Sequence, residues 1–294
     1  MKKLTQKFSE LMARPLTRVL FFAALLVLVL AIAFSVYGKT DRGQSLDDTT
    51  AAARNTQWGD NVTITFGDGN FRYQSNSIPN HALNAEYVMP DNFTPCVPHP
   101  TPDCSHIEPV AQAVVSVTID VKIPTRPLKV AETSSTPFGA MGVLISGSPI
   151  YNPYEGDGTT VAMNANFTLT NAQGQLVPFM DECHGHPAPH PREQYHYHGL
   201  PPCVTAQVDQ ANGPSHIIGF GFDGFPIYGD RDINGQPIDP QTLDKCNGID
   251  SPTPEFPQGI YHYILLNVHT VQSTIRCLHG KLDAPLLTYQ WQLP

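Results

Sequence analysis

The sequence has 294 residues, of which 41% are hydrophobic and only 15% are charged, with 28 prolines and 22 glycines. This composition suits one large domain or two small ones, and it favours short strands and turns over long helices. The net charge is −9, and residues 44–294 hold 24 acidic but only ten basic residues. Because so acidic a body repels phosphate groups, nucleic acid is excluded as a partner, whereas cations are favoured.

The N-terminal segment is basic at first and then strongly apolar. Residues 1–18 form a basic leader, and residues 19–37 form an apolar run long enough to span the hydrocarbon core of a bilayer. The basic leader favours a cytoplasmic N-terminus, so the sequence predicts a single-pass membrane protein with an extracytoplasmic body. The alternative is a cleaved signal peptide, because Ala33–Ser35 has small residues at cleavage-like spacing, and the body would then be secreted.

The body is predicted to be mainly β. Residues 38–57 are small and polar and predict a linker, and the domain follows over residues 58–290. Its first strand is predicted at Asn61–Phe66, where apolar residues alternate ahead of a Gly-Asp-Gly-Asn turn. A Pro-rich loop comes next, and the clearest strand is Ala113–Ile123, which is rich in Val and Ile.

Two segments of the body repeat. GVLISGSPIY at Gly142–Tyr151 and GFGFDGFPIY at Gly219–Tyr228 share the pattern G-x-x-x-x-G-x-P-I-Y. Each is followed by D-x-C-x-G and then by Y-H-Y. Because the blocks recur in the same order, the sequence predicts two internally similar units, at about residues 138–203 and 215–280.

The six cysteines favour disulfides, since their number is even, the body is exported, and none of them belongs to a CxxC pair. Cys96 and Cys104 lie close together in the Pro-rich loop and are expected to pair. Six cysteines allow fifteen connectivities, and only the repeat selects among them. Pairing within each unit predicts the bridges Cys183–Cys203 and Cys246–Cys277, and it leaves no cysteine to act as a nucleophile.

The segment YHYH supplies the main candidate metal ligands. Residues i and i+2 of a strand share a face, so the imidazoles of His196 and His198 can reach one zinc or copper ion. The third ligand is expected from CHGH, with His186 preferred and His184 in reserve, because a Cys183–Cys203 bridge would hold that segment beside the strand. The alternative is that these histidines are hydrogen-bonded members of a polar core.

Other residues are candidates for supporting roles. Asp181 or Glu182 could bind the ion or accept an imidazole N–H. Asp181 and Asp223 are candidate acid/base groups, although Asp223 could instead cap a turn. In the second unit, His262 is the only counterpart of the histidine pair, because that copy reads YHYI. Only the first unit is therefore expected to carry a full site.

A second cation-binding pattern lies in GDRDINGQPID. Asp230, Asp232 and Asn234 occupy alternate positions, as in the first half of a calcium loop. Gln241, however, stands at the closing position where a bidentate Glu is expected. The alternative, which the sequence favours, is a β-hairpin with an Asn-Gly turn.

The segments YHYHGLPPC, DECHGH, GFDGFPIYG, SNSIPNH and GSPIYNPY together resemble the YHYH-domain family of exported proteins. The resemblance runs from about Trp58 to Leu282. It implies no particular activity and no particular fold. It does add His81, in SNSIPNH, to the histidines that are candidate ligands.

We therefore expect an extracytoplasmic, membrane-anchored protein that binds a divalent metal ion, zinc or copper in preference to calcium. The expected ligands are His186, His196 and His198, with His81 as a further candidate. An ion with an open coordination position would serve a hydrolase or, if the ion is copper, an oxidase. The alternative is a non-catalytic surface or adhesion module with structural histidines and bound calcium.

Overall fold

The computed structural model describes residues 47–83, 86–90, 107–111, 114–134, 139–166, 169–170, 176–188 and 194–282. The predicted anchor at 19–37, its basic leader and the predicted pair of Cys96 and Cys104 lie outside these residues. The described residues all belong to one unit, which begins at Asp47. Within this part of the chain, no helix combines the length and the apolar character that a membrane span needs.

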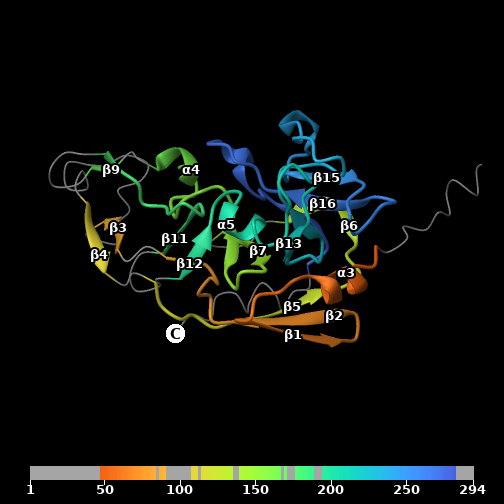
Figure 1. Ribbon diagram of the computed structural model, residues 1–294. Helices are drawn as coiled ribbons and strands as arrows, with labels where there is room; N and C mark the ends of the chain where they lie inside the picture. Colours follow the sequence, from red (N-terminus) through yellow and green to blue (C-terminus); the bar gives the residue numbers. More distant parts are fainter. Residues whose placement is uncertain are drawn as a thin grey trace, which may run out of the picture. The chain divides into compact units, whose positions relative to one another are not determined.

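Strands dominate the described residues, as the composition predicts (Figure 1). A three-stranded antiparallel sheet has the order β1-β2-β5, with β1 at Val62–Gly67, β2 at Asn70–Ser75 and β5 at Ile119–Pro124. Alternate residues of β5 are buried, as expected of a sheet with one face on the core. The first predicted strand is confirmed, whereas β5 begins at Ile119 and not at Ala113.

A mixed sheet of eight strands holds both copies of the repeated segments, in the order β11-β12-β8-β7-β13-β14-β16-β15. Its strands are β7 (Ala140–Leu144), β8 (Pro149–Tyr151), β11 (Gly185–Pro187), β12 (Tyr195–Tyr197), β13 (Ile217–Gly221), β14 (Pro226–Tyr228), β15 (Gly248–Ser251) and β16 (Ile260–Ile264). The central strands β7 and β13 pair antiparallel. On either side of them the same pairings recur: first an antiparallel neighbour, then a parallel one, then an antiparallel edge strand.

The registers of these pairings correspond as well. Tyr197 of β12 pairs with Ile150 of β8, and Tyr263 of β16 pairs with Ile227 of β14. The pairing of β7 with β8 shifts register after Ala140, and that of β13 with β14 shifts at the corresponding place. Each Y-H-Y segment is therefore held in the same way by its neighbours.

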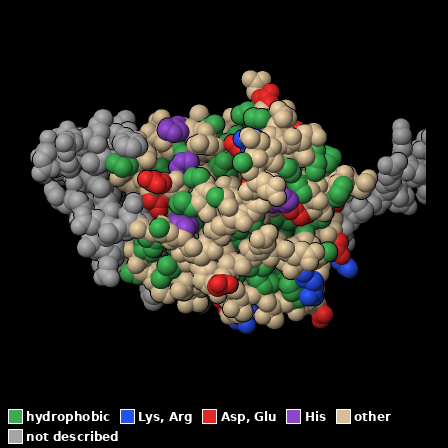
Figure 2. Space-filling view, viewed as in Figure 1, with side chains coloured by type: hydrophobic (Ala, Val, Ile, Leu, Met, Phe, Trp, Pro, Cys, Tyr) green, Lys and Arg blue, Asp and Glu red, His purple; other side chains and the backbone are tan. Residues whose placement is uncertain are grey.

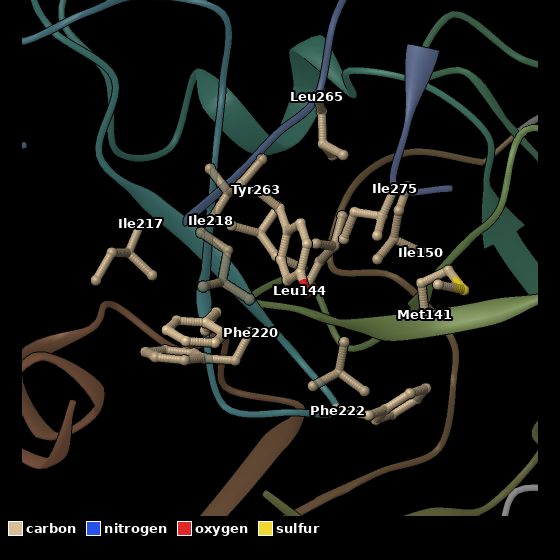
Figure 3. Packing of buried hydrophobic residues seen from close by; sticks show 14 of the residues in the cluster. Met141, Leu144, Ile150, Ile217, Ile218, Phe220, Phe222, Tyr263, Leu265 and Ile275 are labelled. Carbon is tan, nitrogen blue, oxygen red and sulfur yellow. The ribbon is translucent and has the colours of Figure 1, made fainter. Parts of the chain in front are cut away.

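The core lies around the central strands. All residues of β7 and β13 are buried, so both faces of these strands are covered. Trp58 stacks on Phe220 of β13 with ring centroids 5.8 Å apart, and the Tyr73 hydroxyl donates to the Leu144 carbonyl at 3.0 Å. Figure 3 shows side chains of β7 and β13 packed in one cluster. A Cβ atom on Gly142 would lie 2.4 Å from the Phe220 carbonyl oxygen, so this close pairing requires glycine.

Helical segments are short. Helix α3 (Thr50–Asn55) lies inside the range predicted as a linker, and its Ala52 and Ala53 are buried in the main core. This part of the predicted linker therefore packs with the folded body. The other segments are α4 (Ala162–Ala165), α5 (Pro202–Thr205) and the 3-10 turns η1 (Pro240–Thr242) and η2 (Val271–Ser273).

Three two-stranded pairs complete the described structure. They are β3 (Glu86–Pro90) with β4 (Ile107–Ala111), β6 (Lys129–Ser134) with β17 (Leu278–Gly280), and β9 (Leu169–Thr170) with β10 (Leu176–Val177). The disulfides Cys183–Cys203 and Cys246–Cys277 are both present, which confirms the pairing predicted from the repeat. The described protein is thus a mainly β structure with little helix and two disulfides.

Candidate metal centre

Strand β12 brings three predicted ligands together. His186 of β11 is the register partner of His196 of β12, and His198 follows β12 on the same side as His196. One ring nitrogen of each of the three histidines lies within 4.8 Å of those of the other two. All three side chains are buried, with His198 only 1% exposed. The structure thus brings together the three histidines that the sequence favoured as metal ligands.

Each of these imidazoles has one nitrogen already in use. The three Nδ1 atoms lie at hydrogen-bond distance from backbone carbonyl oxygens: 3.0 Å from Pro187 for His186, 2.9 Å from Gln194 for His196 and 2.8 Å from Asn152 for His198. A carbonyl oxygen only accepts, so each Nδ1 must carry the proton. Each Nε2 then keeps its lone pair, which is the arrangement that metal-binding histidines adopt.

Two of the remaining nitrogens lack hydrogen-bond partners. Nε2 of His186 and Nε2 of His198 are buried and form no hydrogen bond with the protein. Leaving such a group unsatisfied costs about 1–3 kcal/mol. An apolar core would avoid this cost, and a bound cation would remove it.

Glu155 lies beside these histidines, although no sequence motif includes it. Its Oε1 is buried without a hydrogen bond and lies 3.7 Å from Nε2 of His186. The backbone N–H of Glu155 donates to the Thr160 carbonyl at 2.9 Å, which fixes the loop after β8. A single Glu in a loop matches no ligand pattern, and only the fold brings it next to β11.

Burial keeps all four groups uncharged in the absence of an ion. It lowers the pKa of His196 to about 4 and the pKa of His186 and His198 well below its ordinary value, with the neighbouring imidazoles adding to the effect on the latter two. Burial, with a smaller contribution from Asp157, raises the pKa of Glu155 to about 8. The His186–Glu155 contact is therefore not an ion pair at neutral pH. A divalent cation would favour the carboxylate and the neutral imidazoles together.

Aromatic and apolar side chains surround the cluster. The Tyr151 ring stacks on His196 with centroids 4.1 Å apart, and Phe179 packs edge-on against His186 at 5.1 Å. Phe179 belongs to a small apolar cluster with Ala162, Met163, Ala165 and Met180. On the face drawn in Figure 2, histidine and acidic side chains lie close together in the left half of the described surface.

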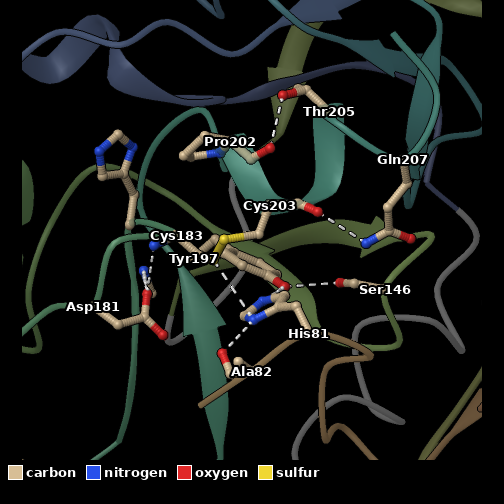
Figure 4. The surroundings of a disulfide bond; sticks show 12 residues. His81, Ala82, Ser146, Asp181, Cys183, Tyr197, Pro202, Cys203, Thr205 and Gln207 are labelled. Atoms are coloured by element: carbon tan, nitrogen blue, oxygen red, sulfur yellow. Dashed lines mark hydrogen bonds between the residues drawn. A yellow bond between two sulfur atoms is a disulfide. The ribbon is translucent and has the colours of Figure 1, made fainter. Parts of the chain in front are cut away.

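His81 lies apart from the three histidines, on the tyrosine face of β12 (Figure 4). Its Nδ1 donates to the Ala82 carbonyl at 2.8 Å, so its Nε2 accepts from the Tyr197 hydroxyl at 2.8 Å. The Ser146 hydroxyl then donates to the same Tyr197 oxygen at 2.9 Å. The nearest sulfur atoms, of Cys183 and Cys203, are joined in a disulfide and are not free to bind an ion with His81.

The candidates in the D-x-C-x-G turn have structural partners. The Asp181 carboxylate accepts from the backbone N–H of Cys183 at 2.8 Å and from the Tyr195 hydroxyl at 2.8 Å. His184, at a positive φ of 60°, donates from Nδ1 to the Leu200 carbonyl at 2.6 Å. Glu182 is exposed. These residues shape the turn that precedes β11 and do not reach the histidine cluster.

The corresponding positions of the second half lack the cluster. His262 occupies the place of His196, and its Nδ1 donates to the Ile260 carbonyl at 2.8 Å. Its strand partner is Ile249, where His196 has His186. Asp223 is fully buried and accepts from the Tyr263 hydroxyl at 2.5 Å and from the Gly280 N–H at 2.7 Å. Burial raises the pKa of Asp223 to about 6.

The candidate calcium segment forms a tight turn. Oδ1 of Asp232 accepts from the N–H groups of Asn234 and Gln236, at 2.9 and 2.8 Å. An antiparallel bridge joins Arg231 to Pro237 across the turn. Asp230 contributes its backbone carbonyl, which accepts from Ile238 at 2.8 Å. This is the hairpin alternative, and the Asp232 carboxylate is already engaged by backbone donors.

Comparison with protein families bears on the same part of the chain. Residues 120–240 match the family described as YHYH protein. These residues form a YHYH domain. The matched range contains the three clustered histidines and Glu155, and it ends before the second Y-H-Y block. No curated protein and no solved structure matches the chain.

The YHYH motif thus has two faces with different partners. Its tyrosines lie over the disulfide-linked turn, where Tyr195 bonds Asp181 and Tyr197 bonds Ser146. Its histidines face His186 and leave their Nε2 atoms available. The first set of contacts recurs in the second half of the sheet, where Tyr261 bonds Asp244 at 2.9 Å, whereas the histidine cluster does not. The YHYH domain therefore adds a group of three neutral imidazoles to a scaffold that also forms without it.

Proposed function

We propose that the YHYH domain binds one divalent transition-metal ion, zinc or copper, through Nε2 of His186, His196 and His198. The observation that carries the proposal is the convergence of three buried, neutral imidazoles whose Nδ1–H groups already donate to carbonyls. Zn–N bonds are about 2.0–2.1 Å long, so the three nitrogens, which lie within 4.8 Å of one another, need to move closer together around an ion. Imidazole suits both metals.

A purely structural role for the histidines has less support. Buried polar atoms are almost always hydrogen-bonded, and a polar core built for stability would pair both nitrogens of each ring. Here two Nε2 atoms and one carboxylate oxygen of Glu155 are left without partners in the same place. A cation bound by the imidazoles accounts for both nitrogens, and its charge favours a carboxylate nearby. The calcium alternative at Asp230, Asp232 and Asn234 is less favoured, because backbone donors occupy Oδ1 of Asp232.

The ligand set also supports an ion with an open coordination position. Among the described residues, the cluster contains three histidines and no fourth histidine, cysteine or carboxylate at the same mutual distance. Catalytic zinc sites commonly have three protein ligands, whereas structural sites have four. A hydrolytic role with zinc, or an oxidative role with copper, is therefore favoured over a structural ion.

Metal analysis of the purified full chain tests the proposal. We expect close to one equivalent of zinc or copper in the wild type and less than about 0.2 equivalents in His196→Gln. His262→Gln is the matched control, because His262 has the same place on its strand, the same kind of Nδ1 bond and a pKa lowered to about 4. Equal metal content in the two variants, or no metal in the wild type, contradicts the proposal.

The recurring strand pairings support a further proposal, that the two halves of the sheet arose by duplication of one unit. Corresponding registers, corresponding disulfides and the shared tyrosine–aspartate bonds all favour this origin.

The location that we propose is the extracytoplasmic side of a membrane, with residues 19–37 as the anchor. The disulfides support an oxidising compartment. Carbonate extraction of membranes, followed by protease treatment of intact cells, tests anchoring and orientation.

A further inference from the structure

We infer, on the basis of the proposed metal centre, that Glu155 is its general base: it accepts a proton from water held at the open position of the ion. The YHYH domain would then hydrolyse small carbonyl compounds of the ester class. Glu155 lies outside the sequence motifs, and this role would make the centre catalytic and not merely ion-binding.

The position of Glu155 favours a base over a fourth ligand. Its Oε1 lies 3.7 Å from Nε2 of His186, yet Glu155 is not among the residues whose ligand atoms all lie within 4.8 Å of one another. It therefore stands to the side of the point on which the three nitrogens converge. A carboxylate in that place can reach a molecule bound to the ion without occupying a coordination position itself.

The surroundings of Glu155 keep it available for this role. Among the described residues, the carboxylate has no Lys or Arg in ion-pair contact, and its Oε1 forms no hydrogen bond. The loop that carries it is held by the Glu155–Thr160 backbone bond and by the Tyr154–Val161 bridge. A general base needs such a fixed position and a free acceptor oxygen.

Glu155 is also more exposed to solvent than the two histidines compared with it here. Its side chain is 14% exposed, whereas His186 is 5% exposed and His198 is 1% exposed. Water and a small substrate would therefore approach the ion past this carboxylate. The packing of Phe179 and Tyr151 against the histidines favours an uncharged substrate with apolar groups.

The step balances without any co-reactant besides water. The water oxygen forms a bond to the carbonyl carbon, the π electron pair of the C=O bond moves to the carbonyl oxygen, and one water proton passes to the Glu155 carboxylate. Collapse of the tetrahedral adduct re-forms the C=O bond and breaks the bond to the alkoxide. The alkoxide then takes the proton from Glu155, which returns the carboxylate to its starting form.

Hydrolysis of p-nitrophenyl acetate by the zinc-loaded full chain tests the inference. We expect Glu155→Gln to keep close to one equivalent of zinc and to lower kcat/KM about 100-fold or more, because general-base catalysis contributes about 10²–10⁴-fold. Glu182→Gln is the control, because it removes a charge from an exposed side chain that does not reach the histidine cluster. We expect the kcat/KM of this control to stay within about twofold of the wild-type value, whereas loss of a general base should lower kcat/KM about 10²-fold or more.

The cobalt-substituted protein provides a readout besides activity. If Glu155 is a base, the visible spectrum of the Co²⁺ form keeps the band shape and intensity of the wild type in Glu155→Gln. A changed spectrum, or loss of metal in Glu155→Gln, identifies a ligand and overturns the inference. So does unchanged hydrolysis in Glu155→Gln, or wild-type hydrolysis no faster than that of His196→Gln. In the last two cases the metal content of the wild type still decides the proposed function separately.

Discussion

His186 lies directly opposite His196 across the antiparallel strands β11 and β12, with the two ring centroids 4.6 Å apart. Both Nδ1–H groups donate to nearby backbone carbonyls, at Pro187 of β11 and at Gln194, which precedes β12. The two backbone bonds orient the rings before any ion is present. Such preorganisation is what a tight metal site requires, because the ligands lose little freedom on binding.

The second half of the sheet shows how to remove the centre without disturbing the fold. His198→Ile copies Ile264, which takes the corresponding position in YHYI. We expect metal affinity to fall more than about 100-fold, since one of three ligands is lost. The free energy of unfolding of the metal-free protein should change by less than about 1 kcal/mol. The lost bond to the Asn152 carbonyl is offset by removal of an unsatisfied Nε2.

Metal titration and urea unfolding in the presence of a chelator measure the two effects. A large loss of stability in metal-free His198→Ile would show that the imidazole is needed by the fold itself.

The disulfides should differ in their effect on the metal centre. Cys183–Cys203 closes a loop that contains β11 and β12, whereas Cys246–Cys277 closes the corresponding loop without ligands. Replacing either pair by Ala should lower the free energy of unfolding by about 3 kcal/mol. Only the Cys183→Ala/Cys203→Ala protein should also bind metal more weakly. Isothermal titration calorimetry at a temperature where both variants are folded makes the comparison, and equal affinities would contradict it.

Acid should destabilise the metal-free protein through its buried histidines. The folded-state pKa of His196 and of His262 is about 4, below the ordinary value of 6.5, so the unfolded chain binds protons first as the pH falls. Their contribution to stability is complete above pH 6.5 and is lost as the pH falls towards 4. Each histidine should contribute a slope of up to about 1.4 kcal/mol per pH unit. Urea unfolding at pH 7, 6 and 5 should show a smaller slope in His262→Gln than in the wild type.

Asp223 should act in the opposite direction. Burial raises its pKa from 3.8 to about 6, so the folded state binds the extra proton between these values. Its contribution to stability is present below pH 3.8 and is lost as the pH rises through 6. Asp223→Asn keeps an oxygen acceptor for the Tyr263 hydroxyl but does not titrate. Relative to the wild type, this variant should gain about 2 kcal/mol in the free energy of unfolding between pH 4.5 and 7.

Thermal or urea unfolding of both proteins at the two pH values measures this difference. A constant difference between wild type and Asp223→Asn would contradict a raised pKa at this carboxyl.

Sequence patterns predicted those parts of the fold that repeat or alternate. The two disulfides follow from the repeat, and the shared face of His196 and His198 follows from the two-residue period of a strand. His186 was expected beside this strand because a Cys183–Cys203 bridge would hold its segment there, and the structure has both the bridge and the pairing of His186 with His196. The short strands of the central sheet, by contrast, are too brief to give a periodic signal.

The sequence could not predict which loops meet the histidines. Glu155 reaches His186 only because β8 lies parallel to β12, a pairing between segments far apart in the chain. His81 was a candidate from the family pattern, but the fold places it against the tyrosines. Side chains alternate between the two faces of β12. The local sequence does not indicate which of these faces a distant residue will contact.

The location of β11 at the outer border of the eight-stranded sheet has a practical consequence. A strand edge can template pairing with a second molecule once it is uncovered, and the three residues of β11 are buried here. His186 lies in the middle of β11, so a bound ion would connect this edge strand to His196 of β12. Chelation should therefore make self-association the first visible defect, before the protein loses its secondary structure.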